Sequence, residues 1–213
     1  MGGRGRSERP LSRLEGRVSR IVAGHDRVPL AFSGGVGSLV VGSVARKRTD
    51  LQCVVVAVDD APDLAAAALA EKYLDFRVQI LHLTARRAWP LARQVGVAHP
   101  DLSVAEVLAL VPLRAVLDSQ PDAEVLAGFW TDRLGPRARR SIAEERVRVP
   151  LVEVAGPRPM DRADLLGMGR MLGIPEAFLR VRSRSPAAGS GLEPALRALA
   201  REKSTTMARL IRS

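Results

Sequence analysis

The sequence predicts an α/β domain built on a parallel sheet with helices on both faces. Two observations support this prediction. Apolar segments of strand length alternate with segments of helical periodicity along most of the 213 residues, which is typical of parallel sheets. The segment QCVVVAV, residues 52–58, is β-branched and almost continuously apolar, as a central strand buried on both faces should be. We therefore expect a Rossmann-like fold whose ligands bind beyond the carboxyl ends of the strands.

The individual elements follow from periodicity and from glycine and proline positions. The predicted strands span residues 28–32, 52–58, 76–83 and 124–127. The predicted helices span residues 10–23, 38–47, 63–74, 84–97, 103–117, 161–172 and 192–211. Pro90 is expected to bend or split the helix that contains it. Residues 1–10 are expected to form a flexible basic tail, and residues 11–213 a single domain.

The composition indicates a globular protein. Its hydrophobic content is 46%, and no apolar run reaches the roughly 18 residues of a membrane span. The first ten residues lack the apolar segment of a secretory signal. Cys53 is the only cysteine, which excludes an intramolecular disulfide and a cysteine-rich zinc site. We expect a cytoplasmic protein with no membrane partner.

The charge is strongly positive, with a formal net charge of +10. Only three of the 33 basic residues are lysines, namely Lys47, Lys72 and Lys203. Arginine suits phosphate binding because its guanidinium group is planar and bidentate. The arginines are spread along the whole chain, however, which favours ordinary solvated surfaces over a nucleic-acid footprint. Nucleic acid therefore stays an open but less favoured partner.

The most informative segment is the loop Ser33–Ser38, with the sequence SGGVGS, between a predicted strand and a predicted helix. Gly34 and Gly35 let backbone amides approach a ligand closely, while Ser33 and Ser38 add hydroxyl groups. The start of the following helix adds partial positive charge. The loop lacks the Gly-Lys-Ser/Thr ending of a Walker A motif. It predicts a phosphate or pyrophosphate site, against the alternative of a glycine-rich turn with no ligand.

The segment AFSGGVGS resembles the SGGxDS pyrophosphate-binding loop of the PP-loop superfamily, the N-type ATP pyrophosphatases. Four further segments resemble the synthase domain of asparagine synthetases, the last of them the tail of the short archaeal-type members, and they occur in family order. They are VAVDDAPDLAAAALAEKY (56–73), VLAGFWTDRLG (125–135), RVRVPLVE (146–153) and LLGMGRMLGIPEAFLRVRSRSPAAGSG (165–191). The resemblance covers roughly residues 15–200 and implies an adenine nucleotide alpha hydrolase-like, PP-loop fold.

The resemblance also implies a reaction and a site. ATP would adenylate a carboxylate with release of pyrophosphate, and a nucleophile such as ammonia would displace AMP. Mg²⁺ would neutralise the departing pyrophosphate through carboxylate ligands. The implied nucleotide-binding residues are Ser33, Gly34, Gly35, Val36, Gly37, Ser38, Val58, Asp59 and Gly128. The implied metal ligand is Asp132.

The sequence departs from the family pattern at three places. Gly37 stands where the loop motif has its aspartate, so one implied metal ligand is missing. Arg133 stands where the family has a glutamate after the second aspartate. Arg182 and Arg184 take the place of a basic pair that is lysine in many relatives, and they are weak candidates for the catalytic position. Asp59, Asp60 or Asp63 is expected to compensate if a metal is bound.

Three functional hypotheses follow. The first is an asparagine synthetase-like, ATP-dependent ligase that takes a small carboxylate and ammonia, free or delivered by a partner subunit, because no glutaminase domain is expected in 213 residues. The second is a catalytically inactive module that binds a nucleotide or a partner protein. The third is a tRNA-modifying PP-loop enzyme, which the charge favours and the absence of CxxC pairs disfavours. Homo-oligomers are compatible with all three.

Overall fold

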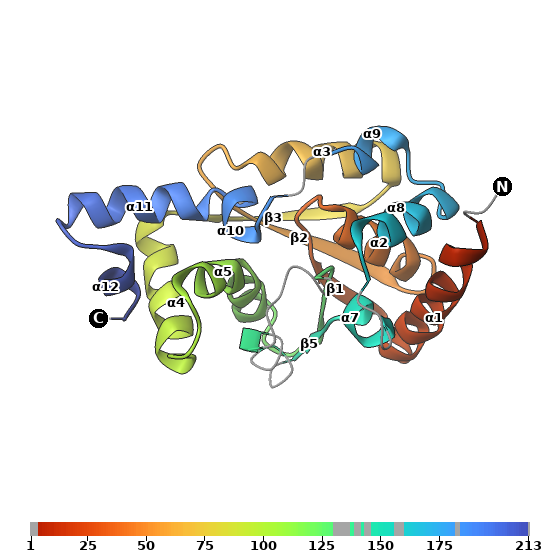
Figure 1. Cartoon of the computed structure of the whole chain (residues 1–213), viewed down its shortest axis with the longest axis horizontal. Helices are drawn as coiled ribbons and strands as arrows, with labels where there is room; N and C mark the ends of the chain where they lie inside the picture. The colour runs from red at the N-terminus through yellow and green to blue at the C-terminus, as the bar shows by residue number, and fades with distance from the viewer. Residues whose placement is uncertain are drawn as a thin grey trace.

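The computed structural model describes residues 4–129, 137, 138, 142, 146–155, 160–181 and 184–212. Its centre is a five-stranded sheet in the order β3-β2-β1-β4-β5, and every neighbouring pair is parallel. The strands are β1 (Arg27–Ala31), β2 (Asp50–Val58), β3 (Arg77–Leu83), β4 (Val125–Ala127) and β5 (Val147–Arg148). The predicted α/β class and parallel sheet are confirmed (Figure 1).

The helices follow the predicted order, with some differences at their ends. They are α1 (Arg4–Val22), α2 (Val36–Ala45), α3 (Pro62–Leu74), α4 (Ala85–Ala98), α5 (Val104–Ser119), α7 (Pro150–Val154), α8 (Arg162–Met171), α9 (Glu176–Leu179), α10 (Pro186–Gly189), α11 (Leu192–Glu202) and α12 (Met207–Arg212). The first helix starts six residues earlier than predicted, so residues 4–10 are helical. The helix that contains Pro90 is not split.

The structure differs from the prediction in two ways in the C-terminal half of the chain. The single helix predicted over residues 192–211 is two helices, because the backbone at Ser204 turns into the left-handed region with φ 49°. Strand β5 and helix α7 were not predicted, since a two-residue strand has too few residues to show periodicity. Trp89 anchors the last helix: its indole N–H donates to the Leu210 carbonyl at 2.6 Å.

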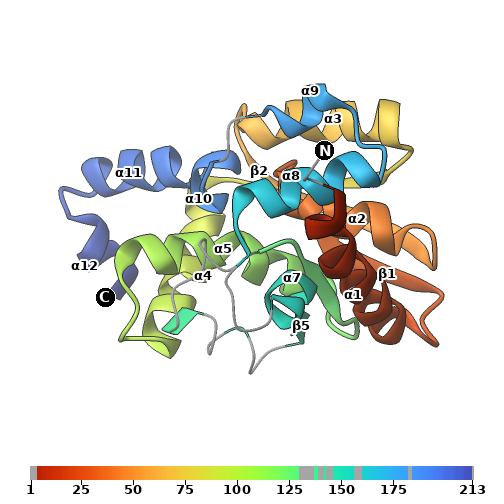
Figure 2. The ribbon, with the colours of Figure 1, turned by 45° about the vertical axis from the view of Figure 1, so that its right-hand side comes forward.

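The sheet has a separate apolar core on each face. Helices α1, α2, α8 and α9 pack on one face, and α4, α5, α11 and α12 on the other. Strand β2 belongs to both cores, because Cys53 and Val55 face the first while Val54, Val56 and Val58 face the second. Successive side chains of the strand point to opposite faces, and both faces are buried. The sequence of β2 is therefore apolar almost throughout. Figure 2 shows α1, α2 and α8 lying together on the first face.

The chain reverses its direction across the sheet between β1 and β4. From β1 it moves outward to β2 and β3 through α2 and α3, whose buried residues belong to the first core. It then returns through α4 and α5 on the opposite face to place β4 beside β1. The loops that follow β1 and β4 therefore start on the two sides of a topological switch point, where open parallel sheets bind ligands.

Of the helices in the described part of the chain, none has both the length and the apolar character needed to cross a membrane.

Candidate functional site

The glycine-rich loop lies where the sequence placed it, between β1 and α2. The Phe32 amide donates to the Val54 carbonyl at 2.9 Å, which extends the pairing of β1 with β2 by one residue. Helix α2 then begins at Val36, with Gly35 as its N-cap and no capping side chain. The first amide to reach an intrahelical acceptor is that of Leu39, which donates to the Gly35 carbonyl at 3.0 Å. The Ser38 amide lies against the backbone of Gly128, while the amides of Val36 and Gly37 donate to no backbone acceptor among the described residues outside the helix. The start of a helix with such amides can bind an anion.

Ser38 has a different role from the one predicted for its hydroxyl. Its Oγ donates to the Gly35 carbonyl at 2.9 Å, so this bond closes the first turn of α2. The hydroxyl oxygen keeps its lone pairs, but its proton is committed to the loop. Ser33 is half-buried, lines the pocket, and shows no side-chain hydrogen bond to another described residue. Of the two serines, Ser33 is therefore the one available to donate to a ligand.

Gly34 is held in place by helix α3. Its φ is +65°, and a Cβ built on it would overlap with Cβ of Ala66. Both facts require glycine here: the left-handed backbone disfavours a side chain, and the alanine-rich helix leaves no room for one. The alanines of α3 thus let the helix pack directly on the loop. Gly34 itself does not line the pocket described below.

Gly37 and Gly128 form a close contact between two backbones. A Cβ on Gly37 would overlap with the Gly128 carbonyl oxygen, and it would lie 3.3 Å from Cδ1 of Leu151. In the other direction, a Cβ on Gly128 would overlap with the backbone of Gly37 and Ser38. The end of β4 therefore rests on the first turn of α2. This packing explains why the loop has glycine at position 37.

A pocket opens beside the loop at the switch point, with an empty volume of about 760 Å³ that includes its open mouth. Its walls combine the loop with apolar side chains of β2 and α5 and with the segment around α10. The lining residues are Ala31, Phe32, Ser33, Gly35, Val36, Gly37, Ser38, Val54, Val56, Asp63, Pro112, Leu113, Val116, Gly128, Phe129, Arg184, Pro186 and Ser190. The pocket thus joins a polar end at the loop to an apolar body.

Asp63 is the buried acidic group of this pocket. It lies in the first turn of α3 after Pro62, and its side chain is 7% exposed. Its carboxyl lies against α10, where a Cβ on Gly189 would overlap with it. It makes no hydrogen bond to another described residue. Burial raises the pKa of Asp63 to about 7, and the charge of Arg184 opposes this rise.

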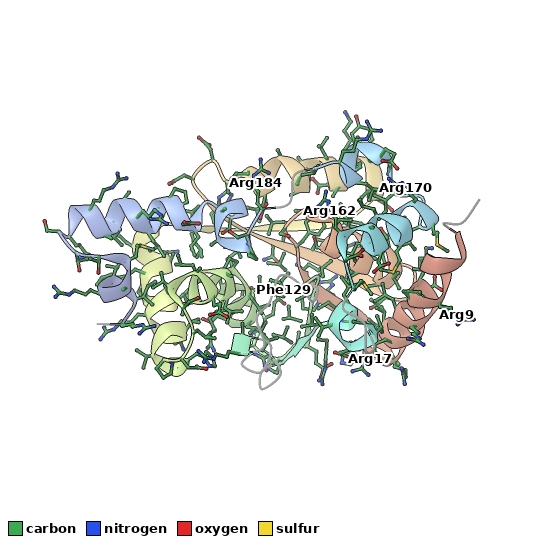
Figure 3. All side chains as sticks on the ribbon, in the orientation of Figure 1. Arg9, Arg17, Phe129, Arg162, Arg170 and Arg184 are labelled. Carbon is green, nitrogen blue, oxygen red and sulfur yellow. The ribbon has the colours of Figure 1, made fainter. Side chains whose placement is uncertain are left out.

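Arg184 is the cation of the pocket. It lies just before α10, its side chain is exposed, and it forms no ion pair or hydrogen bond with another described residue. The backbone around α10 is fixed against the end of β2: the Val58 amide donates to the Ser190 carbonyl at 2.8 Å. A Cβ on Gly191, whose φ is +73°, would overlap with the Val58 carbonyl. Figure 3 shows Arg184 beside α10 and Phe129 beyond the end of β4.

The structure brings together most of the predicted site, but not all of it. Ser33, Gly35, Val36, Gly37, Ser38, Gly128 and Arg184 line one pocket. Val58 and Asp59 do not line it: the amide of Val58 is used by Ser190, and Asp59 is an exposed loop residue with φ 50°. Asp132, Arg133 and Arg182 lie outside the described residues. Phe129, which follows Gly128 and was not predicted as a site residue, lines the pocket.

The described part of the chain shows no group of three or more histidine, cysteine, aspartate or glutamate side chains that could hold a metal ion. Asp63 is the one carboxylate among the described pocket residues. Mg²⁺ prefers several oxygen ligands in octahedral geometry, and this donor set does not supply them. The described residues of the pocket therefore do not fit the implied magnesium ion.

The fold and the pocket together define a Rossmann-like α/β protein with a glycine-rich loop at the switch point of its sheet. The structure is similar to that of NMN synthetase from Francisella tularensis, with a TM-score of 0.51 and 13% sequence identity over 99% of this chain and 84% of that chain. This likeness confirms the Rossmann-like parallel α/β fold. No family model matches the sequence, and no curated protein does.

Proposed function

We propose that this chain binds an adenine nucleotide in the pocket beside the loop Ser33–Ser38. The observation that supports the proposal is the position of the pocket: it lies at the switch point between β1 and β4, next to the start of α2. The phosphate end would lie against the loop, where amides and the Ser33 hydroxyl donate. The base would occupy the apolar body between β2 and α5, which Val54, Val56 and Val116 line.

The enzymatic form of this function is the ligase reaction of the asparagine synthetase type. A substrate carboxylate oxygen attacks the α-phosphorus of ATP, the bond to the bridging oxygen breaks, and pyrophosphate leaves with that electron pair. Ammonia then attacks the acyl carbon of the adenylate, and AMP leaves. The pocket supports the phosphate half of this scheme, because loop amides and Arg184 stabilise negative charge on the departing group.

A nucleotide-binding module without catalysis is the second candidate. The packing of Gly128 on Gly37 favours it, because this contact excludes a carboxylate from the loop position that the ligase motif uses. The two candidates share the nucleotide pocket and differ in the chemical step. Release of pyrophosphate from ATP in the presence of candidate carboxylates separates them: turnover supports the ligase, and tight nucleotide binding without turnover supports the module.

Calorimetry with ATP and AMP on the Ser33→Asp variant tests the site itself. A carboxylate at position 33 would face the phosphate, so we expect the affinity to fall by about tenfold or more. Ser204→Asp is the matched control, since Ser204 is exposed in the connection between α11 and α12. Equal affinities of the two variants would place the nucleotide elsewhere and refute the proposal.

A further inference from the structure

The described walls of the pocket carry only two ionisable side chains, Asp63 and Arg184. They come from the two segments that flank the loop, the start of α3 and the residues just before α10. The helix α2, whose N-terminus contributes partial positive charge, begins at the floor of the same pocket. Among the described residues, the charges at the pocket are therefore one cation, one acid and the start of one helix.

The acid is poorly placed to act as a metal ligand. Its carboxyl lies against the α10 backbone at Gly189 and is 7% exposed. The position that would supply a second carboxylate, Gly37, has no space for a side chain because the Gly128 carbonyl oxygen fills it.

The cation is placed to act on an anion directly. The guanidinium of Arg184 has five N–H donors, and none of them is used by another described residue. A planar guanidinium binds phosphate oxygens in a bidentate manner. Among the described residues packed around Asp63, Arg184 is the one charged group that faces it.

We infer that this pocket binds the phosphate end of its nucleotide without a divalent cation, and that Arg184 supplies the positive charge that a metal would otherwise provide. The inference rests on the proposed function and adds the mode of charge neutralisation to it. The ligand class is a nucleotide or pyrophosphate in its free, metal-uncomplexed form. The loop amides, the start of α2 and Arg184 together surround the phosphate.

The test is calorimetry on the full chain with ATP, AMP and pyrophosphate, each in excess EDTA and in excess Mg²⁺. We expect the dissociation constants in EDTA to equal those in Mg²⁺ within about threefold, or to be lower, because free ATP carries more negative charge than its magnesium complex. Arg184→Gln should weaken binding in EDTA by about tenfold or more, the effect of losing a charged hydrogen bond. The affinity of Arg184→Lys should lie between that of the native chain and that of Arg184→Gln.

Arg93→Gln is the matched control for net charge, because Arg93 is exposed on α4 and does not line the pocket. Binding that appears only in Mg²⁺ would overturn the inference and leave the proposed function standing. Binding in EDTA that Arg184→Gln and Arg93→Gln weaken equally would overturn the role of Arg184. Absence of binding for all three ligands in both buffers would overturn the inference and the proposed function together.

Discussion

Gly37 and Gly128 exclude each other's side chains. The Gly128 carbonyl oxygen fills the space of a Cβ on Gly37, and the backbone of Gly37 and Ser38 fills the space of a Cβ on Gly128. The two residues are 91 positions apart in the chain and meet because β4 pairs with β1. Glycine at position 37 is thus required by the packing of Gly128, the residue that directly follows β4.

A carboxylate introduced at position 37 should damage the fold and should not restore a metal site. Gly37→Asp forces β4 and α2 apart, and overpacking of this kind costs about 1–3 kcal/mol of unfolding free energy. We expect a lower midpoint in urea denaturation and no gain in magnesium affinity. Gly16→Ala is the control, because a Cβ at Gly16 meets nothing within 4 Å and alanine favours the helix. A Gly37→Asp variant as stable as the native chain would contradict the packing.

Gly34→Ala should combine two separable costs. Its φ of +65° strains any side chain, and its Cβ would overlap with Ala66. Gly24→Ala isolates the first cost, because Gly24 has φ +80° and open space around its Cβ; strain of this kind costs about 1–2 kcal/mol. Gly34→Ala should cost more than Gly24→Ala in thermal or urea unfolding. Ala66→Gly in the Gly34→Ala background should recover part of the difference, and no recovery would exclude the steric contribution.

The strands and the loop could be predicted because each is a local pattern. The apolar run of β2 and the SGGVGS segment can each be recognised from a few consecutive residues. The strands β1–β4 start within two residues of the predicted positions. The role of Gly128 could not be predicted in this way. Its contact with Gly37 depends on β4 lying beside β1, and a three-residue strand contains no information about its neighbour.

Asp63 was predicted only as one of three candidates to replace a lost metal ligand, and the structure gives it a different environment. Asp63 is buried because Gly189 of α10 packs against its carboxyl. Gly189 lies more than 100 residues further along the chain. The neighbouring Asp59, which the sequence favoured for the nucleotide, is exposed instead. Residues four positions apart in the chain differ in this way because burial is set by the element that packs on them, which local periodicity does not report.

Cys53 should be inert toward thiol reagents in the folded protein. It is fully buried in β2, and burial raises the pKa of its thiol to about 12, so the reactive thiolate is scarce. We expect labelling by a disulfide reagent at least about a hundredfold slower than in denaturant. Ser204→Cys provides the exposed comparison, and its new thiol should react rapidly in the same preparation. Fast labelling of the native chain would show that β2 opens readily.

Asp63→Asn should stabilise the protein at alkaline pH and have little effect in acid. Burial raises the pKa of Asp63 from 3.8 in the unfolded chain to about 7 in the folded protein. The folded state therefore holds a proton that the unfolded state has lost, and native stability falls as the pH rises from about 4 to about 7. The neutral amide removes this loss, so the variant should gain on the order of a few kcal/mol above pH 7. Thermal unfolding at a series of pH values measures the difference, with the exposed Asp60→Asn as control. A stability difference that does not change between pH 4 and pH 8 would mean that Asp63 titrates alike in the folded and unfolded states.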